Sequence, residues 1–175
     1  DHLPIVSPDG KTLYFVRGGS RNHVGDIYFS EIGNDGKFKE PIKLGDNINT
    51  LKNEQSVFIH PDNKTLYFSS NGRDGMGKTD IYMSRKQEDD SWGPAINLGY
   101  PINTVDQEFK LVVSPDSKHA YFSSKREGGF GELDLYEFEL PEALRPEKIT
   151  YVKGHTFNAK TKDNLEAIIE LIDLE

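Results

Sequence analysis

The chain has 175 residues, 29 acidic against 21 basic side chains, a net charge of −8, and 10 Phe, 8 Tyr, 1 Trp and no Cys. Its aromatic content excludes a disordered polar chain, its acidic balance argues against a nucleic-acid partner, and its lack of cysteine excludes disulfides and cysteine-bound metals. No apolar run approaches the ~20 residues that span a bilayer as a helix.

One pattern occurs three times along the chain. Its first segment contains Pro-Asp, a lysine and a Tyr-Phe pair, and it stands at 7–15, 60–68 and 114–122. A triplet of Asp, Ile or Leu, and Tyr recurs every 54 residues, at 26–28, 80–82 and 134–136. Leu-Gly followed by Ile-Asn-Thr recurs at 44–50 and 98–104. Three coincident registers identify an internal repeat.

Each repeat predicts four short strands. In the middle repeat we expect them at about 55–60, 65–70, 79–86 and 94–99. A Pro-Asp turn joins the first two strands, and the residue after Pro-Asp closes the turn in a left-handed conformation. Gly10 and Asn63 suit that conformation, whereas Ser117 is expected to close its turn less well.

Proline opens the fourth strand of the first two repeats, at Pro41 and Pro94. A residue without an N–H is tolerated there only if the strand lies at a sheet edge. The second and third strands carry apolar triplets such as 66–68 and 81–83 instead of strict alternation, so both faces of the sheet should be covered. Small sheets of four strands, covered on both faces and repeated, are typical of a β-propeller.

The repeats resemble the WD40-like or TolB-like family often named PD40. The matching positions of the middle repeat are Glu54, Pro61, Asp62, Leu66, Tyr67, Phe68, Asp80, Ile81, Tyr82, Trp92, Pro94, Asn97, Leu98, Gly99, Ile102, Asn103 and Thr104. The resemblance covers about residues 1–140. It implies an all-β fold, a partial β-propeller of three four-stranded blades over 1–150, with further blades before Asp1, because propellers close with about 4–8.

The third repeat departs from the pattern after residue 140, which is typical of a chain leaving a repeat array. Residues 148–152 are the candidate for its outer strand. From 151 to 175 two readings fit. Leu165, Ile168, Ile169 and Ile172 match helical spacing, whereas a strand would place Ala167, Ile169 and Leu171 on one face. The segment resembles the opening of a carboxypeptidase regulatory-like β-sandwich, and this resemblance favours the strand and a second domain.

Residues 72–79 have the pattern of a phosphate-binding P-loop, G-x-x-x-x-G-K-T. That mechanism needs a strand before the loop and a helix after it, so that the first amides of the helix hold the phosphates. Here the loop leads into the apolar strand that begins near Asp80. We therefore interpret it as a hairpin loop and expect no nucleotide.

The recurring carboxylates favour an architectural role, because a catalytic pair should break the repeat instead of following it. They are Asp1, Glu54 and Glu108 at one position and Asp26, Asp80 and Asp134 at another. We expect them to accept backbone N–H groups that would otherwise be buried without partners. The five histidines have no metal-ligand spacing, and no catalytic residue, metal or cofactor is predicted.

Side chains that the repeat does not require are the better recognition candidates. Six of them lie in the same long loop of successive repeats and should gather on one rim: Arg21, His23, Arg73, Met76, Arg126 and Phe130. Arg, Met and Phe in loops on a rigid scaffold are typical of protein contacts. Ordinary loops without a partner are an equal alternative.

The sequence thus predicts a non-enzymatic interaction scaffold. Propeller blades followed by a regulatory-like sandwich resemble the multidomain envelope proteins of Bacteroidota, of the OmpA family. That resemblance implies a periplasmic, outer-membrane-associated location, other envelope proteins as partners, peptidoglycan bound through a downstream domain, and a role in type IX secretion or gliding. The alternatives are a propeller-type glycan hydrolase or lyase, and a ligand-sensing domain, each with its site in further blades.

Overall fold

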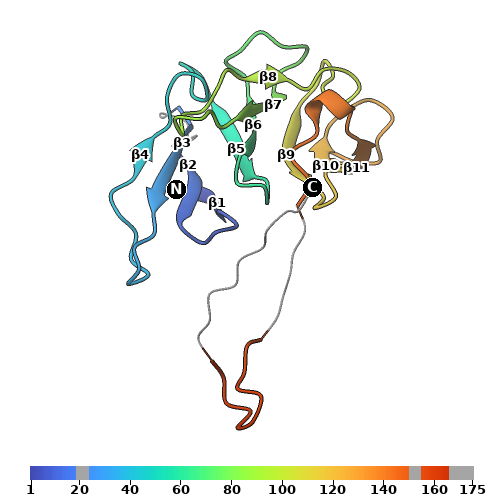
Figure 1. Ribbon diagram of the computed structural model, residues 1–175. Coiled ribbons are helices and arrows are strands. Elements are labelled where there is room, and N and C mark those ends of the chain that lie inside the picture. Colours follow the sequence, from blue (N-terminus) through green and yellow to red (C-terminus); the bar gives the residue numbers. More distant parts are fainter. Residues whose placement is uncertain (19–23, 150–154, 166–175) are drawn as a thin grey trace.

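Three small antiparallel β-sheets make up the computed structural model, which describes residues 1–18, 24–149 and 155–165 (Figure 1). The described residues contain no α-helix. Sheet 1 consists of β1 (His2–Val6), β2 (Thr12–Arg17), β3 (Asp26–Glu31) and β4 (Ile42–Lys43). Sheet 2 consists of β5 (Glu54–Ile59), β6 (Thr65–Ser70), β7 (Asp80–Arg85) and β8 (Ile96–Asn97). Sheet 3 consists of β9 (Glu108–Val113), β10 (His119–Ser124) and β11 (Asp134–Glu139).

The strands of each sheet pair in chain order, so the first strand is one edge and the last strand is the other. The four strands predicted for the middle repeat are confirmed, although β8 is only two residues long. The proline-opened strands β4 and β8 are edge strands, as expected. In the third repeat the described residues form three strands, and most of the candidate fourth strand, 150–152 of 148–152, lies outside the described part of the chain.

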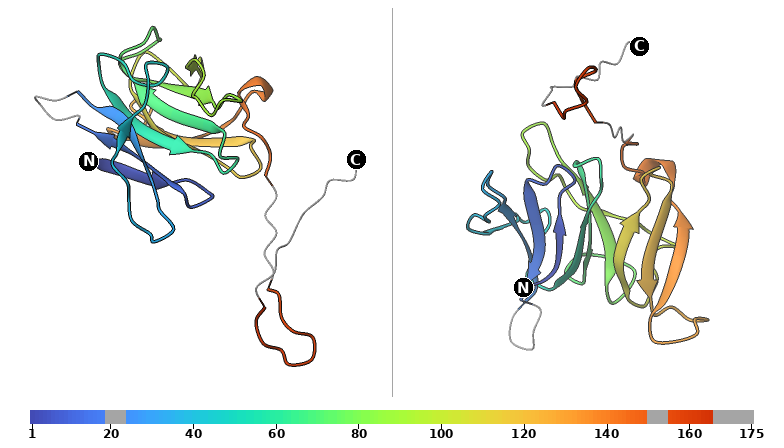
Figure 2. Two further views of the ribbon diagram at one scale, coloured as in Figure 1. Left: turned by 60° about the vertical axis from the view of Figure 1, so that its left-hand side comes forward. Right: turned by 90° about the horizontal axis from the view of Figure 1, so that it is seen from below.

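The sheets stand side by side with sheet 2 in the middle (Figure 2, right). Apolar side chains of sheets 1 and 2 form one core, which includes Tyr14, Val16, Ile27, Leu66 and Phe68. Apolar side chains of sheets 2 and 3 form a second core, which includes Tyr67, Ile81, Met83, Leu111 and Phe122. Every residue of β6 is therefore buried, and the prediction that both faces of the middle sheet are covered is confirmed.

The outer sheets bury one face each. In β11 partly buried and exposed residues alternate, because only one face of sheet 3 contacts sheet 2. Trp92, which follows β7, packs against the core between sheets 1 and 2, and Leu144 of the short 3₁₀ helix η1 (Glu142–Leu144) packs against the core between sheets 2 and 3.

The Pro-Asp turns have the predicted left-handed residue in all three repeats. Its φ is 72° at Gly10, 59° at Asn63 and 63° at Ser117. Serine adopts this conformation with a compensating contact, because its hydroxyl donates a hydrogen bond of 3.0 Å to the carbonyl of Glu147.

The carboxylate of the middle Pro-Asp turn, Asp62, should make the free energy of unfolding depend on pH. Asp62 is buried, and burial alone would raise its pKa, but the neighbouring His60 side chain, the Thr65 hydroxyl and the amides of Lys64 and Thr65 outweigh burial and lower that pKa to about 2. The folded state therefore binds the proton less well than the unfolded state, and the resulting stability is present above pH ~4 and lost as the pH falls towards 2. It amounts to about 2 kcal/mol.

We expect Asp62→Asn to lower the free energy of unfolding at pH 7 and to flatten its fall between pH 4 and 2, measured by urea denaturation at several pH values. Asp116, the equivalent and exposed carboxylate of the third repeat, is the matched control, and Asp116→Asn should have a much smaller effect. If the free energy of unfolding of Asp62→Asn fell between pH 4 and 2 as steeply as that of the unchanged protein, the prediction would be contradicted.

Beyond the sheets, a small antiparallel bridge joins Phe157 and Asn164. The Thr156 hydroxyl donates to the carbonyl of Leu165, whose amide donates to the carbonyl of Thr156 at 3.0 Å. The choice between strand and helix for 166–173 lies outside the described residues.

Candidate functional site

One end of the three sheets carries the long loops, which we call the loop rim. It comprises the β6–β7 loop (71–79), the β10–β11 loop (125–133) and the connections 45–53 and 99–107 that lead into β5 and β9. Strand pairing fixes them at one end, because Ser70 pairs with both Glu54 and Asp80, the residues at which β5 and β7 begin. Ser124 likewise pairs with Glu108 and Asp134.

An aspartate at the start of the third strand shapes each described long loop. The carboxylate of Asp80 accepts hydrogen bonds from the amides of Met76 at 2.6 Å and Gly77 at 3.1 Å. That of Asp134 accepts them from Phe130 at 2.8 Å and Gly131 at 3.2 Å. The expected hydrogen bonds from backbone N–H groups are thus present at Asp80 and Asp134, whereas Asp26 pairs with the Lys43 side chain.

The P-loop-like string forms the β6–β7 hairpin loop, as predicted, and a strand follows it. Two of its amides already bond to Asp80. Gly77 lies so close to the next connection that an added Cβ would stand 2.3 Å from the Thr104 carbonyl oxygen and 2.5 Å from that of Asp106. The loop therefore packs closely against the 99–107 connection.

Two further recurring carboxylates, Glu54 and Glu108, are buried and hold the connections of the loop rim in place. Glu108 accepts hydrogen bonds from the Thr104 amide and hydroxyl and from the Ser124 hydroxyl, at 3.2, 2.6 and 2.9 Å. Glu54 makes the same three contacts with Thr50 and Ser70. Burial raises the pKa of Glu54, although these hydrogen bonds oppose the shift. Both glutamates hold a connection onto a strand, which is a structural role.

The six predicted rim residues divide into three groups. Arg21 and His23 lie outside the described residues. Met76 and Phe130 point outward, and their side chains are 47% and 103% exposed. Because the two residues are 54 positions apart, they occupy the same place in adjacent sheets. Arg73 and Arg126, by contrast, point inward.

Arg126 is not the exposed side chain that the loop sequence suggests, since only 19% of it is accessible. Its guanidinium stacks 5.0 Å from the Phe122 ring centroid and 4.7 Å from that of Tyr136. It also donates hydrogen bonds of 2.9 and 2.7 Å to the carbonyls of Pro101 and Ile102. Arg126 therefore ties sheet 3 to the connection that follows sheet 2.

Arg73 makes the corresponding contact one sheet earlier. It donates to the Asp46 carbonyl at 3.0 Å and lies 5.9 Å from the ring centroid of Phe68. Both arginines thus join neighbouring sheets, and whether they also contact a partner stays a prediction.

Sequence reasoning missed three exposed apolar residues on the loop rim. Leu51 is 97%, Val105 73% and Tyr100 77% exposed. Leu51 and Val105 occupy the same repeat position, directly after Ile-Asn-Thr. The Ile-Asn-Thr motif ends one residue before each of them, so the repeat pattern did not mark either position. Tyr100 and Val105 also line a hollow of about 410 Å³ beside Arg126.

We call Leu51, Met76, Tyr100, Val105 and Phe130 the apolar rim row. Within the described part of the chain, no group of three His, Asp or Glu side chains is placed to hold a metal ion. The apolar rim row favours contact with an apolar surface, whereas the recurring carboxylates Glu54, Asp80, Glu108 and Asp134 accept hydrogen bonds within the chain.

No family model matches the chain, and no curated protein matches it. Among the described residues there is no helix with the length and apolar character of a membrane span.

Proposed function

We propose that the three sheets are consecutive blades of a β-propeller that serves as a non-enzymatic interaction scaffold, with the apolar rim row as its contact surface. The 54-residue repeat, the chain order of strands within each sheet and the side-by-side packing of sheets support the propeller. The observation that carries the interaction role is the row itself, in which five large apolar side chains stand exposed on well-anchored loops.

The outer face of sheet 1 supports a further blade before it. Leu13, Phe15, Phe38 and Pro41 line a shallow hollow of about 260 Å³ there. Their equivalents in sheet 2 are Leu66, Phe68, Trp92 and Ala95, all packed in the core against sheet 1. A face with apolar residues at the same four positions fits the same kind of neighbour, a sheet of the repeat family.

We further propose the setting that the resemblance implies: a periplasmic, outer-membrane-associated protein that contacts other envelope proteins, as in type IX secretion or gliding machinery. A downstream peptidoglycan-binding domain and the regulatory-like sandwich belong to the same proposal.

Photocrosslinking tests the contact surface. A photoreactive phenylalanine analogue placed at Met76 or Phe130 should capture the same protein in cells, because the two positions are equivalent on adjacent sheets. Asp35 and Asp89, in the hairpin loops at the opposite end of the sheets, are matched controls and should not capture it.

With the captured protein purified, Phe130→Ala should weaken its binding about tenfold, as is typical of a central aromatic contact, without changing the unfolding transition of the scaffold. Equal capture at the control positions, or no loss of affinity in Phe130→Ala and Met76→Ala, would overturn the proposal. Loss of glycan-cleaving activity on changing buried carboxylates would favour the enzymatic alternative.

A further inference from the structure

The spaces between adjacent sheets differ in what fills them. After β11, residues 141–147 cross back from sheet 3 to sheet 2. The Tyr67 hydroxyl donates a hydrogen bond of 3.1 Å to the Leu144 carbonyl, and the Arg85 guanidinium donates one of 2.9 Å to the Arg145 carbonyl. A peptide segment of this chain thus lies between sheets 2 and 3, held through its backbone carbonyls by one residue of β6 and one of β7.

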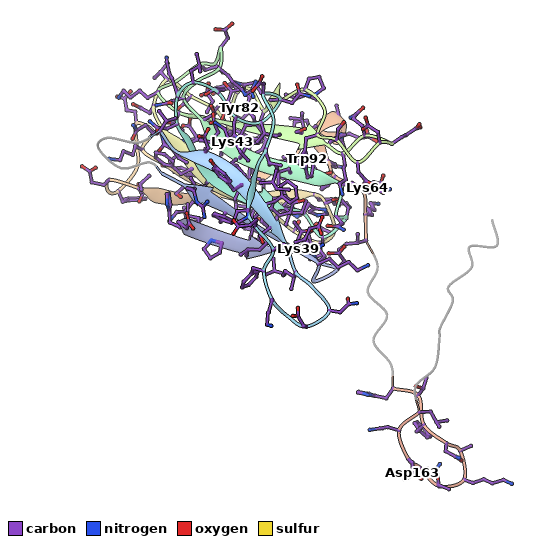
Figure 3. The ribbon with its side chains drawn as sticks, turned by 90° about the vertical axis from the view of Figure 1, so that its left-hand side faces the viewer. Lys39, Lys43, Lys64, Tyr82, Trp92 and Asp163 are labelled. Atoms are coloured by element: carbon purple, nitrogen blue, oxygen red, sulfur yellow. The ribbon has the colours of Figure 1, made fainter. Side chains whose placement is uncertain are left out.

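Between sheets 1 and 2 the corresponding space is an open groove of about 530 Å³. We call it the wedge groove, and its lining includes Thr12, Tyr14, Phe29, Glu31, Lys43, Asp46, Asn47, Lys86, Asp90 and Trp92. Here the chain after β7 turns back in a hairpin, held by the bridge between Lys86 and Trp92, and does not cross to sheet 1. Lys43 and Trp92 both lie on the β4 side of the molecule that Figure 3 shows.

Tyr14 lines the wedge groove, and its hydroxyl has no partner among the described residues. Tyr14 is the repeat equivalent of Tyr67 and is only 5% exposed, yet among the described residues no hydrogen bond reaches its hydroxyl. Burial, and to a lesser degree Asp9, raises the pKa of Tyr14 to about 12, so this hydroxyl is a neutral donor at physiological pH. Its position matches that of the donor that holds Leu144 one sheet further along.

The walls of the wedge groove combine aromatic rings with acidic groups. The Tyr14 ring centroid lies 6.4 Å from that of Phe29 and 6.3 Å from that of Trp92. Glu31 stands where sheet 2 has Arg85, so an acceptor replaces a donor at this place. The two lysines of the lining pair with Asp26 and Asp90, and Glu31 pairs with the exposed Lys39 outside the lining, so a cation of a bound segment would join or replace Lys39 at Glu31.

We propose that the wedge groove binds an extended peptide segment of a partner protein, placed as residues 141–147 are placed between sheets 2 and 3. A carbonyl of that segment accepts the hydrogen bond of Tyr14, and an apolar side chain, in the role of Leu144, packs against Phe29 and Trp92. A lysine or arginine of the segment pairs with Glu31. This site is separate from the apolar rim row and does not depend on its function.

Trp92 is the single tryptophan of the chain and lies in the groove wall, so its fluorescence reports occupancy directly. The probes are two blocked peptides: one with the sequence of residues 141–148, and the same peptide carrying Ala143→Lys. We expect both to change the emission saturably. The lysine peptide should bind more tightly, because residue 143 lies at Arg85, the equivalent of Glu31, and its lysine therefore adds a cation at that place to the Arg145 and Lys148 that both peptides carry.

Three variants test the assignment of contacts. Tyr14→Phe should weaken the lysine peptide about threefold to tenfold, the usual effect of one lost hydrogen bond, whereas the matched control Tyr67→Phe should leave its affinity unchanged. Glu31→Arg gives the wedge groove the same two donors as the space between sheets 2 and 3, so this variant should reverse the preference and favour the unmodified peptide.

A fluorescence response that does not saturate with either peptide would overturn the proposal, as would equal losses in Tyr14→Phe and Tyr67→Phe. Titration with maltohexaose distinguishes a sugar site: a saturable response that Tyr14→Phe abolishes would assign the wedge groove to glycans instead. Near-ultraviolet circular dichroism checks that each variant keeps the native packing.

Discussion

Phe68→Ala is expected to lower the free energy of unfolding by about 3–5 kcal/mol. Phe68 is 1% exposed and lies in the core between sheets 1 and 2, where its ring stacks on Tyr82 at 5.9 Å and supports Arg73. Truncation removes a large buried apolar surface and leaves a cavity, because two rigid sheets cannot close over it. Urea denaturation followed by Trp92 fluorescence measures the loss, since Trp92 belongs to the same core.

Phe130→Ala is the matched control for this prediction. The Phe130 ring is 103% exposed, so its removal should change the unfolding free energy by no more than about 0.5 kcal/mol. Phe68→Leu keeps most of the side-chain volume, so its loss of unfolding free energy should lie between those of Phe68→Ala and Phe130→Ala. Equal stabilities of the Phe68 and Phe130 alanine variants would show that the sheets do not pack as described.

A second large effect is expected for Glu108→Ala, which should cost about 3 kcal/mol or more, since each buried donor left without an acceptor costs about 1–3 kcal/mol. The carboxylate is fully buried, and its loss leaves the Thr104 amide, the Thr104 hydroxyl and the Ser124 hydroxyl without their acceptor. The connection 99–107 is then released from β9, so hydrogen exchange of the Thr104 amide should also accelerate.

Asp1 provides the comparison for Glu108, because it holds the equivalent position in sheet 1. There the partner is Arg17 instead of a serine, and the two form an exposed two-point ion pair with distances of 2.8 and 2.9 Å. Exposed pairs contribute about 0–1 kcal/mol, so Asp1→Ala should be mild. A loss in Asp1→Ala as large as that in Glu108→Ala would contradict the structural role assigned to burial.

The repeat made most of the sheet structure predictable. Pro-Asp turns and apolar triplets are local signals, and they placed the strands of the middle repeat within one or two residues. The left-handed residue was also predictable at Asn63 and Ser117. The compensating hydrogen bond that the Ser117 hydroxyl donates to the Glu147 carbonyl was not, because no local pattern indicates it.

The candidate sites were less predictable, because they depend on contacts between sheets. Arg126 and Phe130 occupy the same loop, yet one stacks on rings of its own sheet and the other faces outward. Leu51 and Val105 directly follow the Ile-Asn-Thr motif, and no sequence pattern marked them as exposed. The wedge groove could not be inferred at all, because it arises from the path of the chain after β7 compared with the path after β11.

The crossing of residues 141–147 has a mechanical consequence. Lys64 pairs with Glu147 at 2.9 Å, and the Glu147 amide donates to Asp62 at 3.1 Å, in addition to the contacts of Tyr67 and Arg85. A pull on the chain beyond residue 149 therefore loads several bonds to sheet 2 in parallel before any tension reaches β11. Sheet 3 is protected from being peeled away strand by strand, and force is transmitted to the middle of the assembly.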